Sequence, residues 1–475
     1  MPESPSHASA NKGSSTSLTE PGDLGLAKGE ARCPGPTPAD IIARDEAVAP
    51  QTPAALKTSR YEFLGDDDLA FSRYTQQSFY DAEIDGLWPR TWQWACREEQ
   101  IPNPGDYYVY DIGPYSIFVT RTQAGDIKAF ANSCPHRGMA FFNPGESGQA
   151  KQFFRCPFHG MSWELDGRLR EIPCRWDFPH INDDDFGLSE VRSGVWGGFV
   201  FINLDSAAPS LADFLGVLPD HFAHQPLADR YIAMHTEKVL PGNWKMCMEG
   251  FLEAFHVLGT HPEALRHSSW ANTQYDIFDK NVTRFLQPLS SGNPHYHREL
   301  SEQELFEGLG HKGQQLPEGM TARDAHAARL RQTKGQELGV DLSNVSTSVM
   351  LDSIEYHLFP NACFFPGIVI PLIYRFRPLT VDTCLHEILL LHPVPDAMLA
   401  KGQRPTPAEK ISLGIDDSYT SVPNFPLAVV LDQDTENFAR QSAGMKAALK
   451  PGQTLGNYQE ARIRRFHMTL DEYLQ

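Results

Sequence analysis

Two short segments carry paired cysteine and histidine residues, and they constrain the fold more than any other feature of the sequence. Cys134-Pro-His136-Arg-Gly is followed by Cys156-Pro-Phe-His159-Gly, with nineteen residues between His136 and Cys156. Thiolate and imidazole are strong metal ligands, and a metal bound by all four side chains would force the two loops together. A set of two cysteines and two histidines is an ordinary zinc combination, so zinc is the first hypothesis.

The order of the ligands favours iron and sulfide over zinc. Each loop pairs one cysteine with one histidine, whereas the usual zinc finger groups two cysteines and then two histidines. This alternation lets two thiolates hold one iron and two imidazoles a second iron, which is the arrangement of a Rieske [2Fe–2S] cluster. Pro135, Pro157 and Gly160 suit tight loops folded over such a cluster.

At CPHRG and CPFHGMSW the sequence resembles the Rieske family at each ligand position. The resemblance implies that Cys134 and Cys156 bind one iron, and that His136 and His159 bind the other. Neutral imidazoles in place of two thiolates raise the reduction potential to about −150 to +300 mV. The predicted cluster would therefore accept electrons from a low-potential donor and relay them.

A second set of metal ligands follows downstream, in NWKMCMEGFLEAFHVLGTHP (residues 243–262). If this segment is helical, Glu249, Glu253 and His256 share one face, and His261 follows where the helix weakens. Two histidines and one carboxylate on one face of Fe(II) form the facial triad of non-haem iron oxygenases, which leaves positions open for O₂. The third ligand must come from elsewhere, and Asp432 and Asp434 are acidic candidates.

With both motifs, roughly from Tyr61 to the C-terminus, the chain resembles the Rieske non-haem iron oxygenases, specifically the large (alpha) subunit of the aromatic ring-hydroxylating family. The resemblance implies Asp434 as the third iron ligand, with Asp432 as the runner-up. It also implies that Glu253 links the cluster of one subunit to the catalytic iron of its neighbour. Many members have Asp at that position, so Glu253 keeps the charge on a longer arm.

Residue composition and hydrophobic patterning divide the chain into four parts and predict the α+β fold class. Residues 1–58 are rich in Ser, Pro, Ala and Gly, which predicts a disordered tail. Residues 59–90 predict a helical segment that packs on the catalytic domain. Short β-type runs over 91–206 predict a small antiparallel β Rieske domain, and 207–475 mixes helices with long strands, which predicts a larger catalytic domain with an antiparallel sheet. Within it, a polar insertion at 285–345 is either a lid or a surface excursion.

The resemblance implies a terminal oxygenase component with one [2Fe–2S] cluster and one mononuclear Fe(II). It would use O₂ to hydroxylate an apolar, aromatic substrate, with ring dihydroxylation favoured and a role in aromatic hydrocarbon catabolism. A monooxygenase or an O- or N-demethylase of the same family is the alternative. A Rieske electron-transfer protein without oxygenase activity belongs to a different class, and it predicts a chain that stops soon after the cluster domain.

Electrons must come from outside, because no G-x-G-x-x-G fingerprint follows a strand in this sequence. A ferredoxin, an NAD(P)H-dependent reductase or both are the expected partners, and the resemblance implies a homotrimer that could also carry a small beta subunit. Lys and Arg number 41 against 60 Asp and Glu, and the formal charge of −19 would repel nucleic acid and anionic membranes. With no signal pattern and no long unbroken apolar stretch, the expected location is the cytoplasm.

Overall fold

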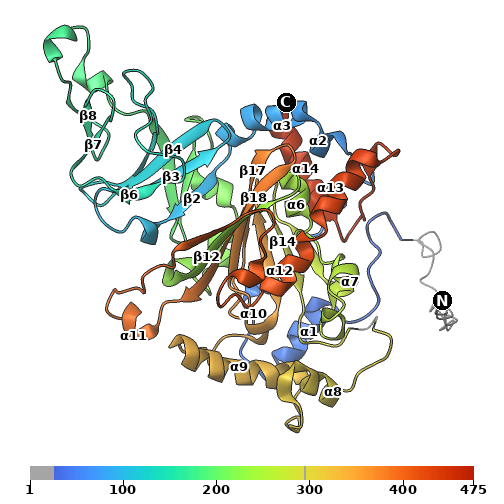
Figure 1. The fold of residues 1–475 in the computed structure, drawn as a ribbon. Helices are drawn as coiled ribbons and strands as arrows, with labels where there is room; N and C mark the ends of the chain where they lie inside the picture. Colours follow the sequence, from blue (N-terminus) through green and yellow to red (C-terminus); the bar gives the residue numbers. More distant parts are fainter. Residues whose placement is uncertain (1–25, 294–295) are drawn as a thin grey trace, which may run out of the picture.

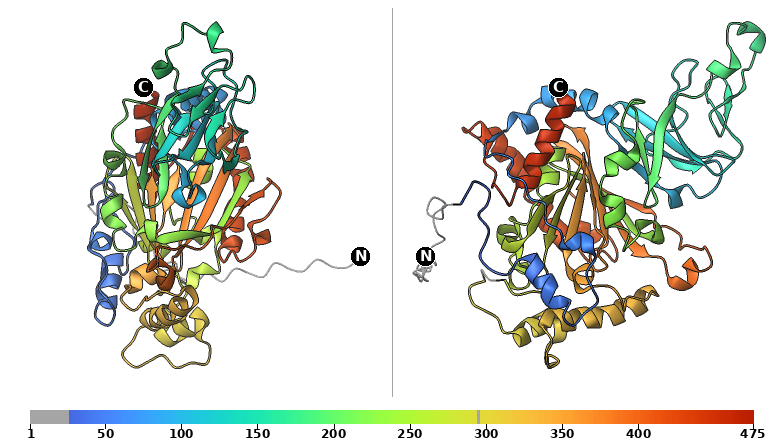
Figure 2. Two further views of the ribbon diagram at one scale, coloured as in Figure 1. Left: turned by 90° about the vertical axis from the view of Figure 1, so that its left-hand side faces the viewer. Right: turned by 180° about the vertical axis from the view of Figure 1, so that it is seen from behind.

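A computed structural model describes residues 26–293 and 296–475. A small β lobe projects from one end of a larger lobe in which helices surround a long sheet (Figure 1). The two views of Figure 2 show the same separation from the side and from behind. The predicted α+β class is confirmed.

The small lobe is built on a seven-stranded antiparallel sheet in the order β2-β11-β10-β5-β4-β3-β6. A separate three-stranded sheet, β7-β8-β9, stands at its outer end (Figure 1). β3, with the sequence DYYVYDI, buries side chains on both of its faces: Tyr107 and Val109 pack into one hydrophobic core, and Tyr108 and Tyr110 pack into another. The bounds are β2 (Gln93–Arg97), β3 (Asp106–Ile112), β4 (Tyr115–Arg121), β5 (Ile127–Ala131), β6 (Ser147–Gln149), β7 (Phe153–Arg155), β8 (Ser162–Glu164), β9 (Leu169–Glu171), β10 (Glu190–Trp196) and β11 (Phe199–Asn203).

The large lobe contains an eight-stranded sheet in the order β13-β14-β15-β16-β17-β18-β12-β19, antiparallel except where β12 meets β19. Its strands are β12 (Arg230–Leu240), β13 (Gln274–Ile277), β14 (Val282–Gln287), β15 (Ser353–Leu358), β16 (Ala362–Phe364), β17 (Leu372–Thr380), β18 (Thr383–Pro393) and β19 (Lys410–Leu413), with the short pair β1 (Leu69–Ala70) and β20 (Gly452–Gln453) outside it.

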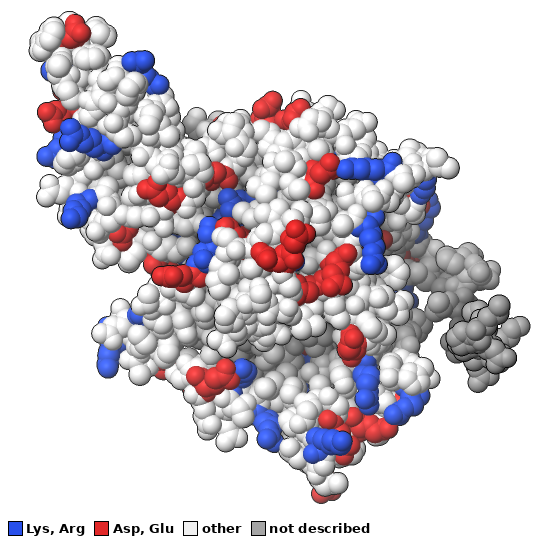
Figure 3. Space-filling view, in the orientation of Figure 1, with Lys and Arg blue, Asp and Glu red and all other residues white. Residues whose placement is uncertain are grey.

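The helices lie mainly around this sheet (Figure 1). They are α1 (Pro38–Asp45), α2 (Ser72–Thr75), α3 (Gln77–Gly86), α4 (Leu211–Leu215), α5 (Leu218–His221), α6 (Trp244–Glu249), α7 (Val257–Thr260), α8 (Glu302–Phe306), α9 (Ala322–Leu338), α10 (Thr347–Leu351), α11 (Asp396–Leu399), α12 (Ala428–Thr435), α13 (Phe438–Ala447) and α14 (Ala461–Leu474). None of the helices in the described ranges is long and apolar enough to cross a membrane. On the described part of the face in Figure 3, basic side chains are interspersed with acidic ones.

The central sheet separates two hydrophobic cores. Successive side chains of each strand therefore point into different cores. Along β15, Ile354 and Tyr356 point into one core, so the intervening Glu355 points to the other face. On the same face as Glu355 lie Cys363 of β16 and Tyr374 of β17, which face each other in the strand register. That face is covered by α6, α12 and α14.

Buried charges join the two lobes. Arg375 of β17 reaches across to β2, where its guanidinium lies over the Trp94 ring at 4.1 Å and donates to the Trp94 carbonyl. Arg377 donates to the carbonyl of Asp111 on β3 at 3.0 Å. Both arginines also bind the buried carboxylate of Glu387. A buried charge must be paired, so these contacts fix the orientation of the β lobe on the larger one.

The predicted disordered tail is wrong for residues 26–58, which form an ordered strap with α1 and a 3₁₀ turn at Ala54–Lys57. We call residues 26–60 the N-terminal strap. Asp45 at the end of α1 pairs with the buried Arg323 of α9 at 3.0 Å. Arg284 of β14 donates to the strap carbonyls of Ala55 and Thr58, each at 2.8 Å. Composition missed the strap because a few buried apolar side chains, Ile42 and Leu56, anchor it together with these polar contacts. Residues 1–25 lie outside the described residues.

Residues 59–90 contain α2 and α3, which contact α13 and α14 of the large lobe. A buried ion pair strengthens this contact, because Glu83 of α3 lies 2.7 Å from the ammonium group of Lys245 on α6. The segment therefore helps to hold the helix that precedes the second set of predicted metal ligands.

Candidate metal centres

The two loops with paired cysteine and histidine have the same backbone design. We call residues 134–139 and 156–161 the cluster loops; the second joins β7 to β8. In the first loop the Cys134 N–H donates to the Met139 carbonyl at 2.8 Å, and in the second the Cys156 N–H donates to the Met161 carbonyl at 2.8 Å. Each loop turns at a glycine with φ near +75°, a conformation that favours glycine.

The cluster loops bring like ligands together in pairs. The His136 and His159 rings lie 4.8 Å apart between centroids, and the Cys134 and Cys156 thiols lie within hydrogen-bonding reach of each other. Burial raises the pKa of the Cys134 thiol. A single zinc ion would need the ligand atoms of all four side chains to meet at one point. Among the described residues, no three of these four meet so closely. Separate cysteine and histidine pairs fit a two-iron cluster instead.

The surface beside the cluster loops is apolar and exposed. Phe158 is 54% exposed and contacts the His159 ring, with 3.8 Å between ring centroids and 37° between the ring planes. Trp176, in the loop that places Phe178 against His136, is 81% exposed. Exposed aromatic side chains next to a redox group suit contact with another protein surface.

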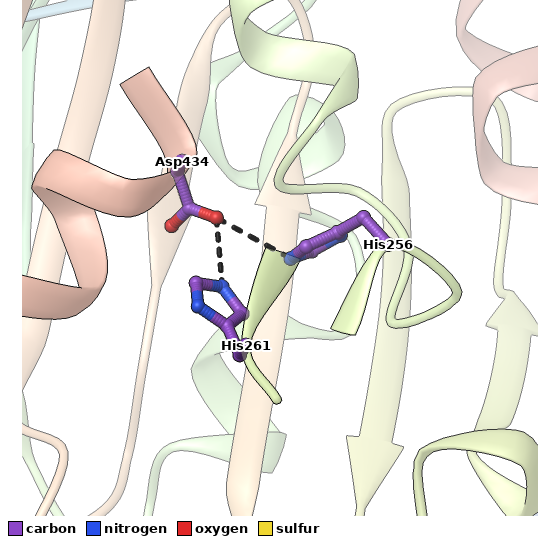
Figure 4. A group of neighbouring side chains, drawn as sticks. All are labelled: His256, His261 and Asp434. Carbon is purple, nitrogen blue, oxygen red and sulfur yellow. Dashed lines mark hydrogen bonds and ion pairs between the residues drawn. The ribbon is translucent and has the colours of Figure 1, made fainter. Parts of the chain in front are cut away.

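A second group of ligands meets in the large lobe, where the side chains of His256, His261 and Asp434 converge (Figure 4). We call these residues the iron triad. The Oδ1 atom of Asp434 lies 2.8 Å from Nε2 of His261 and 3.5 Å from Nε2 of His256. All three ligand atoms lie within 4.8 Å of one another, so one ion could bind them together.

The histidines come from a broken helix rather than the single helix that the spacing predicts. α6 ends at Glu249, the chain from 250 to 256 is not helical, and α7 begins at Val257. Glu249 turns away from Glu253 and His256 and binds His467 of α14 at 2.7 Å and the Tyr74 hydroxyl. The helix stops at Gly250, where continuing costs about 1 kcal/mol relative to alanine, and the buried partners of Glu249 fix its direction.

The two candidate aspartates point in different directions. They are two residues apart on α12, which turns their side chains to different sides of the helix. Asp434 is buried against the two histidines. Asp432 accepts hydrogen bonds from the Ser418 hydroxyl and from the backbone N–H groups of Tyr419 and Thr420. Burial acts against ionisation of Asp432, but these hydrogen bonds outweigh it and hold its pKa below the usual value.

The far nitrogen of each histidine has a partner. Nδ1 of His256 lies 2.9 Å from Glu253 Oε1, and Nδ1 of His261 lies 2.8 Å from Gln433 Oε1. Because these oxygens can only accept, each Nδ1 carries the proton and each Nε2 keeps its lone pair for a metal. Burial disfavours charge on His256, yet Glu253 and Asp434 outweigh it and raise its pKa. Gln433 is a site residue that the sequence reasoning missed.

Two family descriptions match the chain. The "Ring hydroxylating alpha subunit (catalytic domain)" family matches residues 226–475, which is more than half of the chain, and the "Rieske [2Fe-2S] domain" matches residues 91–181. The chain belongs to the Rieske oxygenase alpha subunits. The predicted family is therefore confirmed, and its domains are those that hold a [2Fe–2S] cluster and a mononuclear iron.

Similar proteins include both dioxygenase and monooxygenase subunits. The alpha subunit is 32% identical to the biphenyl 2,3-dioxygenase subunit alpha of Rhodococcus jostii, over 39% of this chain and 41% of that protein. It is 29% identical to the glycine betaine monooxygenase oxygenase subunit of Pseudomonas aeruginosa, over 46% of this chain and 50% of that one. A solved quaternary ammonium Rieske monooxygenase has the same fold, with a TM-score of 0.62 at 17% identity over 86% of this chain and 95% of that one.

A cavity of about 160 Å³ lies beside the iron triad of this alpha subunit. Its apolar wall includes Phe251 and Val257, whereas the neighbouring Leu252 lies in the core, and Phe255 and Leu258 are about half exposed. The far wall is formed by β14, β15 and the 365–374 stretch. It contains four polar residues that the sequence reasoning missed: Gln287, Ser353, Glu355 and Tyr374. The first residues of the predicted 285–345 insertion belong to β14, and two of them, Phe285 and Gln287, line the cavity. None of the described residues from 288 to 345 lines it.

Proposed function

We propose that this alpha subunit is the terminal oxygenase of a multicomponent system that hydroxylates an uncharged, apolar aromatic substrate with O₂. The observation that carries the proposal is that one chain holds two different ligand sets, one of them beside a cavity. The cluster loops would hold the [2Fe–2S] cluster, and the iron triad would hold a ferrous ion. When bound, the ferrous ion supplies open coordination positions at which O₂ reacts next to the substrate.

The cavity residues bind and orient the substrate. Phe251, Phe365 and Tyr374 line it with aromatic surface, with 5.5 to 5.7 Å between the centroids of neighbouring rings. A cavity of this size holds about one benzene ring, and its apolar wall favours a ring over a small polar molecule. Apolar walls also exclude bulk water from the reacting face of the triad. These features support ring dihydroxylation as the favoured reaction.

Glu253 would couple the two metal sites. Its carboxylate holds Nδ1–H of His256, and it would face the cluster of a neighbouring subunit in a ring of three. A protonatable carboxylate beside a ligand imidazole allows a proton to accompany each electron. Electrons would enter from a ferredoxin, an NAD(P)H-dependent reductase or both, in the cytoplasm, and a small beta subunit could join the trimer.

A monooxygenase or demethylase is the second candidate, and the similarity to subunits of glycine betaine and carnitine monooxygenases favours it. These relatives act on quaternary ammonium compounds by name. An electron-transfer role alone gives no reason for the iron triad and its cavity, so we set it aside.

Anaerobic purification followed by iron and sulfide analysis tests the cofactors. We expect about three irons and two sulfides per chain and a Rieske signal by electron paramagnetic resonance. The protein, with a reductase and ferredoxin, would then be given ¹⁸O₂ and either toluene or glycine betaine. Two labelled oxygens in a toluene diol support the proposal. Formaldehyde from glycine betaine without reaction of toluene would instead support the demethylase. Two irons per chain, without the mononuclear ion, would refute both the aromatic oxygenase and the demethylase.

A further inference from the structure

A polar corner interrupts the otherwise apolar wall of the cavity. Glu355 of β15 and Tyr374 of β17 both line it and both are buried in the sheet. The Tyr374 hydroxyl donates to Oε2 of Glu355. Arg462 of α14 donates to Oε1 of the same carboxylate at 2.8 Å. Burying polar groups beside an apolar pocket costs free energy. We therefore expect this polar corner to have a role in ligand binding.

The polar corner has used its hydrogen-bond donors within the protein. The Tyr374 proton is directed at Glu355, and burial raises the pKa of Tyr374 well above its usual value, so the phenol keeps that proton. Gln287, at the edge of the same cavity, donates an amide N–H to the Ser268 hydroxyl at 2.6 Å. A phenol oxygen and an amide oxygen keep lone pairs when their donors are engaged. The wall therefore offers acceptors, which match a donor on the ligand.

The charges around the cavity are already balanced. Arg462 neutralises Glu355. A ferrous ion in the iron triad would be neutralised by Asp434 and Glu253, since both carboxylates are in contact with its histidine ligands. A cationic substrate would then be buried without a counter-charge. Contact of a cation with an aromatic ring stabilises binding by only about 0.5–2 kcal/mol. This gain does not offset the free-energy cost of burying an unpaired charge.

We infer that the Tyr374 hydroxyl, held by Glu355, accepts a hydrogen bond from a hydroxyl or amine group on an uncharged single-ring substrate, and thereby sets the specificity of the cavity. The inference rests on the proposed function, because it assigns the substrate class of that same site. Donation to a carboxylate polarises the phenol and makes its oxygen a stronger acceptor. A substrate that lacks such a donor would leave the buried Tyr374 oxygen without a hydrogen bond from the ligand.

Calorimetric titration of the purified holoprotein tests this without turnover. The ligands are phenol and fluorobenzene, which have similar shapes but differ in the donor, and benzyltrimethylammonium as the cation. A purely apolar cavity would prefer fluorobenzene, because phenol must lose the water around its hydroxyl. We expect phenol to bind at least as tightly as fluorobenzene, and the cation to bind more weakly than either. A preference for fluorobenzene or for the cation in the unaltered protein overturns the inference.

The variant Tyr374→Phe keeps the ring but removes the hydroxyl, which is both the acceptor for the ligand and the donor to Glu355. We expect its affinity for phenol to fall about tenfold while fluorobenzene binding changes less than twofold. Tyr356→Phe is the matched control, because Tyr356 is an equally buried tyrosine on β15 whose hydroxyl contacts Arg284 on the opposite face of the sheet. Equal losses for both ligands in Tyr374→Phe would mean a structural role and would refute the inference.

Binding and turnover separate the two levels of the proposal. Selective phenol binding without any oxygenation product would leave the inference standing and remove the proposed function. Oxygenation of toluene with no effect of Tyr374→Phe on the binding of phenol would do the reverse. If Tyr374→Phe does not fold, the comparison of ligands in the unaltered protein still decides.

Discussion

At the scale of single residues, metal binding at the iron triad depends on which imidazole nitrogens are available as ligands. Glu253 and Gln433 each occupy the outer nitrogen of one histidine, so both inner nitrogens face Asp434. These contacts fix the imidazole tautomer before a metal binds, so that each Nε2 lone pair is available to the metal. Replacement of such outer partners commonly weakens metal binding or activity 10- to 100-fold.

Asp434→Ala should remove the mononuclear iron while leaving the cluster intact. We expect the iron content to fall from about three to about two per chain with an unchanged Rieske signal, because the cluster loops lie in the other lobe. Asp432→Ala is the control, and it should keep all the iron because Asp432 is held by the 418–420 turn. Loss of iron in the control alone would identify Asp432 as the ligand.

Glu253→Gln should separate metal binding from electron transfer. The amide keeps the size of the side chain and can still accept from His256, so iron content should stay within a few per cent of normal. Without a carboxylate, we expect reoxidation of the reduced cluster by O₂ and substrate to slow by tenfold or more in stopped-flow absorbance. Glu253→Asp should recover part of that rate. An unchanged rate in Glu253→Gln would show that the carboxylate has no coupling role.

Candidate ligands that are close in the chain are easier to predict from sequence than distant ones. The spacing of His256 and His261 suggested that they meet, and their ring centroids lie 5.4 Å apart. Asp434 had to be chosen from two aspartates by resemblance, because only the packing of α12 decides which one faces the histidines. Glu355 and Tyr374 gave no signal, since they meet only through the strand register of a sheet whose pairing no short motif encodes.

At the scale of elements, the N-terminal strap supports the loop that carries the histidines. Its residue Cys33 packs with Ala254, Val257 and Trp270, and the Asn272 side chain donates to the carbonyl of Pro34 at 3.3 Å. A segment with the composition of a linker therefore covers the outer side of the iron loop.

The docking of the strap should weaken as the pH rises through neutrality. Burial raises the pKa of Asp45 from 3.8 to about 7, although Arg323 opposes this, and Asp352 and Asp324 add to it. A folded-state pKa above the unfolded value stabilises docking fully below pH 3.8, and this contribution is lost as the pH passes 7. The loss is at most about 4 kcal/mol.

Hydrogen-exchange protection factors for α1 at pH 5, 6, 7 and 8 measure this effect. We expect protection to decline across the series in the unaltered protein and to stay level in Asp45→Asn, with α3 as the internal reference. The same decline in the variant would exclude Asp45 as its cause.

At the scale of the whole molecule, the two metal centres lie in different lobes. β7 and β8, which flank the second cluster loop, stand at the outer end of the small lobe, whereas α7 and α12, which flank the iron triad, lie in the large lobe (Figure 1). An arrangement of this kind suits a closed ring of identical subunits, in which each cluster serves the neighbour's iron.

Mixed oligomers test that arrangement. Cys134→Ser and Asp434→Ala chains are each expected to be inactive alone, because one lacks the cluster and the other lacks the iron. Co-expressed with different tags and purified through both, they should recover about one third of normal activity, the share of intact cluster-to-iron pairs in a ring of three. Inactive mixed rings would place electron transfer within one chain.

The iron triad also has a mechanical meaning. His261 and Asp434 are 173 residues apart in the chain, so an ion bound between them acts as a reversible cross-link, as a disulfide does in a secreted domain. Closing so long a loop costs conformational entropy that the metal bonds offset, and the gain is lost when the metal leaves. The iron supply of the cell would then set how long each chain survives its proteases as well as how many sites are filled.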